Sequence, residues 1–310
     1  MRVLVTGATG FVGRAVVRQL ATEGHSIIGF ARTSRPCPCE LRTANILDEA
    51  ALAAAVDGVD AVCHLAALTL VRQSFAEPVR NFRVNVAGTL NLLDAMSAEA
   101  QRSGRKLRLV FASTGAVYGT PETQPITELQ GPMPSSPYAA SKLAAEIAIG
   151  YQAALGGIGA VTLRTFNVAG AVDGQGDTDT SRIIPKTLMV AAGQADCLSV
   201  NGDGSAVREY IHVRDLARAY ALALDAADIT GHRVYNVGSG VGVSVREVIK
   251  AAEHITGRSV PVRWGPSASE PRELRADISR IGAELGWQPN SSALENIIAD
   301  AWEALNGSAR

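Results

Sequence analysis

Short apolar stretches alternate with longer amphipathic ones over the first two-thirds of the 310-residue chain. Runs rich in β-branched residues predict strands, and apolar residues three or four apart predict helices. The expected strands are Arg2–Thr6, Ser26–Ala31, Ala61–Leu65, Leu107–Ala112 and Ala160–Arg164, with helices at about 11–23, 49–56, 79–103 and 138–155 between them. This alternation predicts an α/β fold, a doubly wound parallel sheet with helices on both faces.

The pattern changes near residue 170. A polar segment from Asp173 to Asp179 is followed by isolated helices and short strands. The expected helices lie at about 181–193, 213–227, 244–256 and 291–305, and the strands include Arg233–Val237 and Val260–Arg263. We therefore expect residues 1–170 to form one domain and residues 171–310 to form mainly a smaller lobe that is interleaved with the sheet.

Three glycines, Gly7, Gly10 and Gly13, stand where the first strand passes into the first helix. The first permits a tight turn, the second lets the backbone approach a pyrophosphate, and the third allows close packing of helix and strand. Free N–H groups at the helix start then face the anion. An ordinary glycine-rich turn is the alternative, but the strand before and the helix after favour a Rossmann-type dinucleotide-binding domain over residues 1–170.

Charge and hydropathy restrict the partners. The chain has 29 Lys and Arg against 30 Asp and Glu, so no overall field exists to hold nucleic acid or an anionic membrane. No uncharged apolar run approaches the roughly 18 residues that a membrane span needs. The N-terminus lacks the features of a secretory signal. We expect a cytoplasmic protein with no nucleic-acid or membrane partner.

The four cysteines are Cys37, Cys39, Cys63 and Cys197, and their spacing is not that of a disulfide framework. Reduced thiols are the simpler interpretation. Cys37 and Cys39 form a Cys-Pro-Cys sequence, but no second Cys or His pair at ligand spacing accompanies them. We expect no metal site.

The glycine spacing G-x-x-G-x-x-G resembles that of the extended short-chain dehydrogenase/reductase family, in its NAD-dependent epimerase/dehydratase group. Further motifs agree: His64-Leu-Ala-Ala67, Asn85 in Asn-Val-Ala-Gly-Thr-Leu, Ser113-Thr-Gly-Ala-Val-Tyr-Gly119 and Tyr138-Ala-Ala-Ser-Lys142. The resemblance covers nearly the whole chain. It implies a nicotinamide cofactor held by Gly7, Gly10, Phe11, Val12, Gly13, Arg32, Asn45, Ile46, Leu65, Ala66, Ala67, Asn85, Tyr138 and Lys142.

Tyr138 and Lys142 are four residues apart in an expected helix, so both side chains lie on one face. An ammonium group and a cationic nicotinamide ring lower the pKa of a tyrosine, which then takes a hydroxyl proton near neutral pH. The alternative for this spacing alone is an ordinary amphipathic helix surface. In the resembled family the residues that match Thr114, Tyr138 and Lys142 are catalytic, and the lysine also holds the nicotinamide ribose.

The downstream half resembles UDP-glucose 4-epimerases and their close relatives. The matching segments are Leu163–Ala171, Asp203–Asp215, Tyr235–Gly240 and Gly286–Pro289. The resemblance implies a nucleotide-diphosphate sugar as substrate, a UDP-hexose, with Asn167 and Arg208 on the diphosphate and Thr114 on the sugar. A guanidinium group suits phosphate geometry, although a surface arginine in an ion pair is the alternative for Arg208.

Two departures from the family pattern stand out. The late Arg-x-Gly-Asp region reads Ser267-Ala-Ser-Glu270 here, which leaves Arg272 as the nearby cation. In nucleotide-sugar 4,6-dehydratases an Asp-Glu pair follows the catalytic threonine, whereas this chain has Gly115 and Ala116. Because neither side chain transfers a proton, we expect redox at a sugar carbon without elimination.

The resemblance therefore implies a nucleotide-sugar 4-epimerase, which oxidises C4 transiently and returns the hydride to the opposite face. An NADPH-dependent reductase of a nucleotide-linked 4-keto-6-deoxy sugar is an alternative, because Gly29–Arg32 and Arg164–Asn167 also resemble that subgroup. A cofactor-binding regulatory protein without turnover is another. Helices near 79–103 and 138–155 pair into a homodimer in the resembled family, and we expect the same here.

The end of the second strand bears on the choice between NAD and NADP. NAD-using members generally have an acidic residue there, which binds the adenosine ribose hydroxyls. This chain has Ala31 and then Arg32, with Ser34 and Arg35 close behind. The small residue and the guanidinium groups favour a 2′-phosphate and hence, slightly, NADP. NAD remains the alternative, since it is the usual epimerase cofactor.

Overall fold

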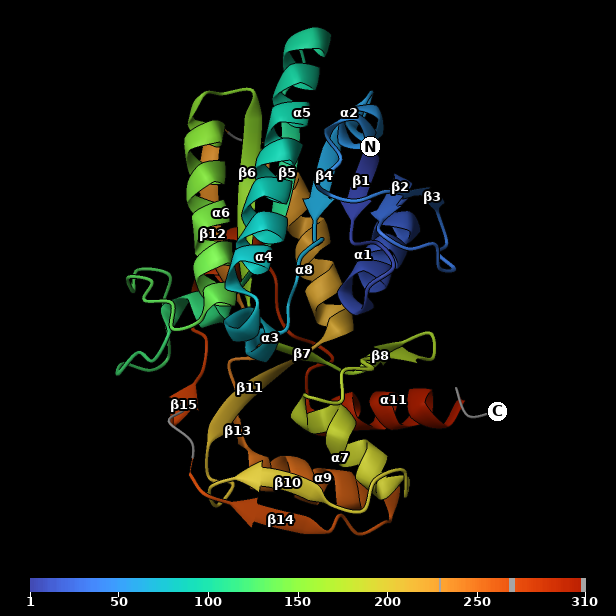
Figure 1. Ribbon diagram of the computed structural model, residues 1–310, viewed down its shortest axis with the longest axis vertical. Helices are drawn as coiled ribbons and strands as arrows, with labels where there is room; N and C mark the ends of the chain where they lie inside the picture. The colour runs from blue at the N-terminus through green and yellow to red at the C-terminus, as the bar shows by residue number, and fades with distance from the viewer. Residues whose placement is uncertain (229, 268–270, 308–310) are drawn as a thin grey trace.

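A parallel seven-stranded sheet dominates the computed structural model, which describes residues 1–228, 230–267 and 271–307 (Figure 1). The strands lie in the order β12-β6-β5-β4-β1-β2-β3. Their bounds are β1 Arg2–Thr6, β2 Ser26–Ala31, β3 Glu40–Thr43, β4 Ala61–His64, β5 Leu107–Thr114, β6 Ile158–Thr165 and β12 Gly231–Val237. The expected α/β fold with a doubly wound parallel sheet is confirmed. The strand order reverses between β1 and β4, and open α/β sheets generally bind ligands at the carboxyl ends of the strands at such a point.

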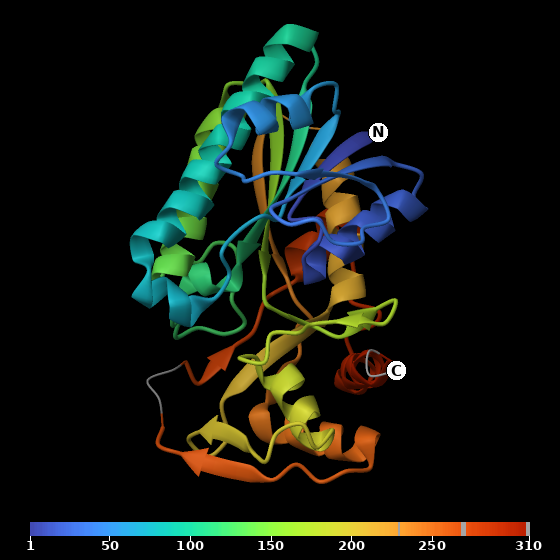
Figure 2. The same cartoon turned by 45° about the vertical axis from the view of Figure 1, so that its right-hand side comes forward.

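Helices cover both faces of the sheet, as Figure 2 shows. One layer contains α1 (Phe11–Thr22) and α8 (Val213–Ala226), and the other contains α2 (Glu49–Val56), α5 (Gly88–Ser103) and α6 (Pro137–Ala154). Successive strand residues supply the two cores because side chains alternate across a strand. Val3 and Val5 pack in the core beside α1 and α8, whereas Leu4 packs in the core beside α2, α5 and α6.

The chain beyond residue 170 builds a smaller lobe below the carboxyl ends of the strands (Figure 1). Its elements are β8 (Ala171–Val172), β9 (Gln175–Gly176), α7 (Ile183–Ala191), β10 (Leu198–Asn201), β11 (Val207–His212), β13 (Gly242–Ser244), α9 (Val245–Thr256), β14 (Val262–Gly265), β15 (Glu273–Leu274) and α11 (Leu294–Gly307). Two elements return to the large sheet: α8 packs on its face and β12 pairs with β6, while α10 (Ser279–Leu285) lies against both. No helix among the described residues is long and apolar enough to cross a membrane.

Two of the differences from the expected elements lie in the large sheet and the helices that cover it. The helix expected at 79–103 consists of α4 (Pro78–Phe82), a π-helical turn (Arg83–Ala87) and α5, and it is preceded by the short α3 (Val71–Ala76). The edge strand β3 was not expected. Its four residues include one apolar side chain and are half-buried or exposed, so they carry little periodic signal.

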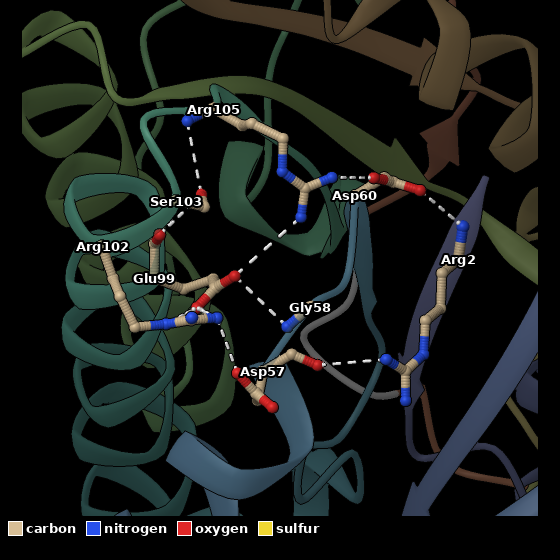
Figure 3. A network of polar contacts seen from close by, with 8 residues as sticks. All are labelled: Arg2, Asp57, Gly58, Asp60, Glu99, Arg102, Ser103 and Arg105. Atoms are coloured by element: carbon tan, nitrogen blue, oxygen red, sulfur yellow. Dashed lines mark hydrogen bonds and ion pairs between the residues drawn. The ribbon is translucent and has the colours of Figure 1, made fainter.

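A polar network ties loops together at the amino-terminal edge of the sheet (Figure 3). Glu99 is only 5% exposed, and its Oε1 accepts a hydrogen bond from the Gly58 amide at 3.2 Å. Its Oε2 accepts from Arg102 Nε at 2.8 Å, and Arg102 also reaches Asp57 at 2.7 Å. Glu99 therefore joins the end of α5 to the α2–β4 loop.

Replacing Glu99 with Ala should lower the free energy of unfolding by about 1–3 kcal/mol, because a partly buried amide and a guanidinium group lose their buried acceptor. Urea denaturation measures the change. The control is Arg80→Ala, which removes the exposed Arg80–Glu77 pair and should cost under about 1 kcal/mol. Equal losses for the two variants would contradict a special role for the Glu99 network.

Candidate functional site

The residues expected to form the site gather at the carboxyl edge of the large sheet. Gly7 follows β1, Leu65 follows β4, Thr114 ends β5, and Asn167 lies just beyond β6. This edge is the usual ligand position in an open α/β sheet, at the point where the strand order reverses.

The glycine turn between β1 and α1 is sterically determined. Gly7 has φ +72°, and a Cβ there would lie 2.9 Å from the Ala66 amide nitrogen. A Cβ on Gly13 would lie 2.1 Å from the Gly7 carbonyl oxygen. Neither position accepts a side chain, so α1 begins directly against the end of β1.

The start of α1 fits a pyrophosphate. Gly10 is the N-cap residue and its position supplies no side-chain cap to the first-turn amides, which include those of Phe11 and Val12. Gly10 is exposed, and so leaves the approach to these amides open. An uncapped helix N-terminus with an open glycine approach suits an anionic group, as a dinucleotide cofactor requires. In the described residues no group of three or more His, Cys, Asp or Glu side chains could hold a metal ion.

A buried hydrogen-bonded chain supports the loop after β4. The Thr89 hydroxyl donates to the Asn85 carbonyl at 2.7 Å, so it must accept from His64 Nε2 at 2.9 Å. His64 Nδ1 then accepts from the Thr6 hydroxyl at 2.7 Å, and Thr6 Oγ1 accepts from the amides of Leu65 and Ala66, each at 3.2 Å. Burial, with the nearby Lys142 charge, lowers the pKa of His64 to about 3. His64 is therefore a neutral structural residue.

Asn85 connects this loop to the helix that carries Tyr138. Its Oδ1 accepts from the Leu68 amide at 2.8 Å, and its Nδ2 donates to the Leu68 carbonyl at 3.1 Å. Nδ2 also donates to Ser141 Oγ at 3.0 Å, and Ser141 donates to Asn81 Oδ1 at 2.9 Å. The side chain of Asn85, which lies in the π-helical turn, therefore positions the β4 loop and α6.

Tyr138 and Thr114 meet at the carboxyl edge. Tyr138 is in the first turn of α6, which Ser136 caps by accepting a hydrogen bond from the Ala139 amide at 3.2 Å. Burial raises the pKa of Tyr138, and its hydrogen bond with Thr114 and the charge of Arg182 oppose that rise only in part. Further positive charge must therefore reach the phenol before it ionises near neutral pH.

Lys142 lies one helical turn beyond Tyr138 and is 3% exposed. Its Nζ is 4.1 Å from the centroid of the Phe111 ring, a cation–π contact. Burial lowers the pKa of Lys142 to about 7, although the carboxylate of Glu146 opposes the change. The amine therefore lies in a dry setting that disfavours its charged form, although the field of that form is strong there.

A buried ion pair beneath Lys142 was not predicted from the sequence. Glu146 accepts from Arg164 Nη2 at 2.7 Å, and both side chains are buried. Glu146 also accepts from the Ser113 hydroxyl, and Arg164 Nη1 donates to the Tyr118 hydroxyl at 3.0 Å. The one available signal was the position of Glu146, one turn after Lys142 on the same helix.

Asn167 and Arg208 come together through strand pairing, because β7 (Asn167–Ala169) pairs with β11. Asn167 is exposed and its Nδ2 donates to the Glu209 carbonyl at 3.0 Å. Arg208 Nη1 donates to the carbonyls of Val207 and Pro271 at 2.8 and 2.9 Å. Arg272 is exposed and its carbonyl accepts from the Val207 amide at 2.8 Å, which places it beside β11. Residues 268–270 of the divergent Ser267–Glu270 stretch lie outside the described residues.

The residues expected near the adenosine follow β2 and β3. Ala31 ends β2 and is buried, whereas Arg32 is exposed. Asn45 is exposed and its Oδ1 accepts from the Leu47 amide at 3.1 Å, while the side chain of Ile46 packs against Gly88. No carboxylate occupies the position of Ala31.

The position of Arg182 near Tyr138 was also not predicted from the sequence. It is the N-cap residue of α7, and it pairs with Asp177 at 3.0 Å and with Asp179 at 3.2 Å. Its positive charge lowers the pKa of Tyr138, so the smaller lobe contributes to the field at the phenol. No local periodicity marks such a long-range contact.

Comparisons with known proteins identify the family and the fold. The model of the NAD dependent epimerase/dehydratase family matches residues 3–238. The chain is 37% identical to a UDP-glucose 4-epimerase of Corynebacterium glutamicum, over 97% of this chain and 95% of the relative. Among solved structures, UDP-glucose 4-epimerase of Stenotrophomonas maltophila with bound NAD and formylated UDP-arabinopyranose has a TM-score of 0.92 and 32% identity, covering 100% and 99% of the two chains. UDP-glucose 4-epimerase of Brucella ovis in complex with NAD has a TM-score of 0.90 and 35% identity, covering 97% of each chain.

The lowered pKa of Lys142 predicts a specific pH dependence of stability. The folded chain binds one proton fewer than the unfolded chain between about pH 7 and about pH 10, so this residue adds stability as pH rises through that window and costs stability below it. Lys142→Met removes the titrating group. We expect the free energy of unfolding of the variant, relative to that of the parent, to be higher at about pH 6 than at about pH 9 by more than about 1 kcal/mol. Urea denaturation at both pH values measures this. The exposed control Lys106→Met should show no such trend, and identical pH dependence in both variants would contradict a lowered pKa.

Proposed function

We propose that this chain, which belongs to the NAD dependent epimerase/dehydratase family, is a nucleotide-sugar 4-epimerase that interconverts UDP-glucose and its C4 epimer. The observation that carries the proposal is the meeting of Thr114 and Tyr138, with Lys142 one turn away, between the glycine turn and the Asn167–Arg208 pair. The relatives that share nearly the full length of the chain are UDP-glucose 4-epimerases. They favour neither the ketoreductase nor the regulatory alternative.

The cofactor of this proposal is a nicotinamide dinucleotide. Gly7, Gly10 and Gly13 with the amides of Phe11 and Val12 would hold its pyrophosphate, and Lys142 would hold its nicotinamide ribose. Asn45, Ile46 and the backbone of Leu65 to Ala67 border it, while Asn85 positions that loop and Arg32 lies at the adenosine end. When bound, the nicotinamide ring accepts the C4 hydride and gives it back.

Tyr138 moves the proton in this reaction. Its phenolate takes the proton of the sugar 4-hydroxyl as C4 is oxidised, and it returns that proton when C4 is reduced on the other face. Thr114 donates a hydrogen bond to the same sugar oxygen and keeps it beside the phenol. Arg182 supplies positive charge that favours the phenolate, against the burial that raises the pKa of Tyr138. The ammonium form of Lys142, one helical turn away, would add to this field.

The residues after Thr114 argue against 4,6-dehydration. Gly115 is buried, and a Cβ there would lie 2.9 Å from the Phe166 ring. An acidic side chain does not fit at that position without displacing the ring. Ala116 has no group that transfers a proton, so the reaction is confined to redox at C4.

The substrate diphosphate is assigned to Asn167, Arg208 and Arg272. Asn167 and Arg272 are exposed beside β11, where they contact the Glu209 carbonyl and the Val207 amide, and Arg208 lies on that strand. Two guanidinium groups and an amide suit the two phosphates of a nucleotide-diphosphate sugar. The bound UDP-sugar of the Stenotrophomonas relative supports a uridine nucleotide.

Tyr138→Phe should lower turnover of UDP-glucose by about 10²-fold or more, because the proton-transferring hydroxyl is lost. Cofactor affinity, measured by fluorescence titration, should change little. The assay supplies no reductant, since an epimerase regenerates its cofactor on every turnover whereas a reductase consumes it. Full activity in the variant, or activity in the parent only with added reductant, would contradict the proposed mechanism.

We also propose that the site accepts NADP as well as NAD, which is bound in the structures of its relatives. Ala31 leaves space for a 2′-phosphate and Arg32 offers it a charge-assisted hydrogen bond. We expect NADP to bind the apo-protein at least as tightly as NAD, and Arg32→Ala to weaken NADP selectively by about tenfold, near 1.4 kcal/mol. Isothermal titration of both cofactors tests this. A protein that binds NAD and rejects NADP would leave Arg32 without this role.

We also propose that the chain is a homodimer. Ile147, Tyr151 and Leu155 form an exposed apolar stripe along α6, with Val79 and Leu90 exposed on the neighbouring α4 and α5. Light scattering should give the mass of two chains, and a variant with Ile147→Asp and Tyr151→Asp should give the mass of one. A monomeric parent would contradict the proposal.

A further inference from the structure

The loop between β2 and β3 brings two thiols into contact. Cys37 Sγ and Cys39 Sγ are 3.0 Å apart, closer than two sulfur atoms normally approach without a bond or a hydrogen bond. The two cysteines are separated only by Pro38, so their proximity is local and does not depend on a distant element. Both side chains are partly buried against the core beside α1.

The structure also provides a place for the second thiol on the sheet. Gly29 of β2 faces Cys39, and a Cβ at Gly29 would lie 2.9 Å from Cys39 Sγ. The glycine therefore leaves room for this sulfur against the strand. The Cys39 sulfur therefore has a defined position against β2, and the Cys37 sulfur lies next to it.

We propose that Cys37 and Cys39 form a redox-reversible disulfide, and that the Cys-Pro-Cys loop is a thiol modification site. The bond would tie the loop that connects β2 to β3, the same loop that begins with Arg32. The proposal does not depend on the reaction that the protein catalyses.

The two sulfurs have different roles. Cys37 lines a cavity of about 540 Å³ beside α1, together with Arg14 and the Arg18–Asp173 ion pair, so a small reagent reaches it. Burial, with the hydrogen bond and charge of Cys37, raises the pKa of Cys39 to about 12. Cys37 is therefore the thiol that reacts first, and Cys39 is the resolving thiol.

The oxidant in this proposal is glutathione disulfide, and the exchange balances as two successive displacements. The Cys37 thiolate attacks one glutathione sulfur, a mixed disulfide forms, and a glutathione thiolate leaves. That modification removes the contribution of Cys37 to the raised pKa of Cys39. Cys39 then loses its proton and attacks Cys37 Sγ, and the second glutathione leaves. Two protein thiols are oxidised, and one glutathione disulfide is reduced to two thiols that carry the two protons.

The test uses the purified full chain without cofactor or sugar, equilibrated with glutathione disulfide, acid-quenched and alkylated under denaturing conditions. Trypsin cleaves after Arg32 and Arg42 and leaves the Arg35–Pro36 bond intact, so one peptide, Thr33–Arg42, contains both cysteines. We expect this peptide to resist alkylation and to lose the mass of two hydrogens, and dithiothreitol to reverse both changes. Alkylation of both cysteines at every glutathione ratio would overturn the proposal.

Two variants separate the roles of the sulfurs. Cys39→Ser should stop at the mixed disulfide and gain one glutathione on Cys37, whereas Cys37→Ser should react slowly and form no disulfide within the peptide. The matched control is Cys197→Ser, which removes a partly exposed thiol elsewhere and should leave oxidation of the peptide unchanged. A parent protein that stops at the mixed disulfide, without closure by Cys39, would also overturn the proposal.

Discussion

The close contact between α1 and the turn after β1 is the constraint on which the rest of the site depends. A Cβ on Gly13 would lie 2.1 Å from the Gly7 carbonyl oxygen, so the helix can begin at the strand end only with glycine there. That contact places the uncapped amides of α1 at the carboxyl ends of β1 and β4. The other site residues lie at neighbouring strand ends or at the start of α6, and so share this edge of the sheet.

Charged side chains are buried on α6, the helix that carries Tyr138 and Lys142. Their burial lowers stability but serves the proposed function. Lys142 is buried, and the resulting fall of its pKa to about 7 shows the cost of keeping an ammonium group out of water. One turn further, Glu146 and Arg164 satisfy each other in a buried ion pair with additional hydrogen bonds. Such a pair adds little net stability, but removing one partner would leave an uncompensated charge beneath Lys142. The network therefore fixes the position of α6 relative to β5 and β6.

The sequence predicted those parts of the molecule whose determinants are local. The glycine turn consists of three glycines, each three residues after the last, at a strand-to-helix junction. Tyr138 and Lys142 are one helical turn apart. Both motifs can be recognised from the order of residues alone. The edge strand β3 could not be predicted, because its half-exposed residues carry no clear alternation. Glu146–Arg164 and the influence of Arg182 on Tyr138 could not be predicted either, since they join segments that meet only through the tertiary fold. Arg272 stays a prediction, because its place beside β11 comes from a backbone hydrogen bond and not from a contact with phosphate.

In the proposed reaction, C4 of a nucleotide sugar is oxidised and reduced again without exchange with solvent. The direct measurement is the incubation of the protein and its cofactor with UDP-glucose that carries deuterium at C4, in ordinary water. Mass spectrometry and NMR of the C4 epimer then report the fate of the label. We expect the epimer to form without added reductant and to retain the deuterium at C4. Replacement of the label by solvent hydrogen, or a product that accumulates only with added reduced cofactor, would contradict it.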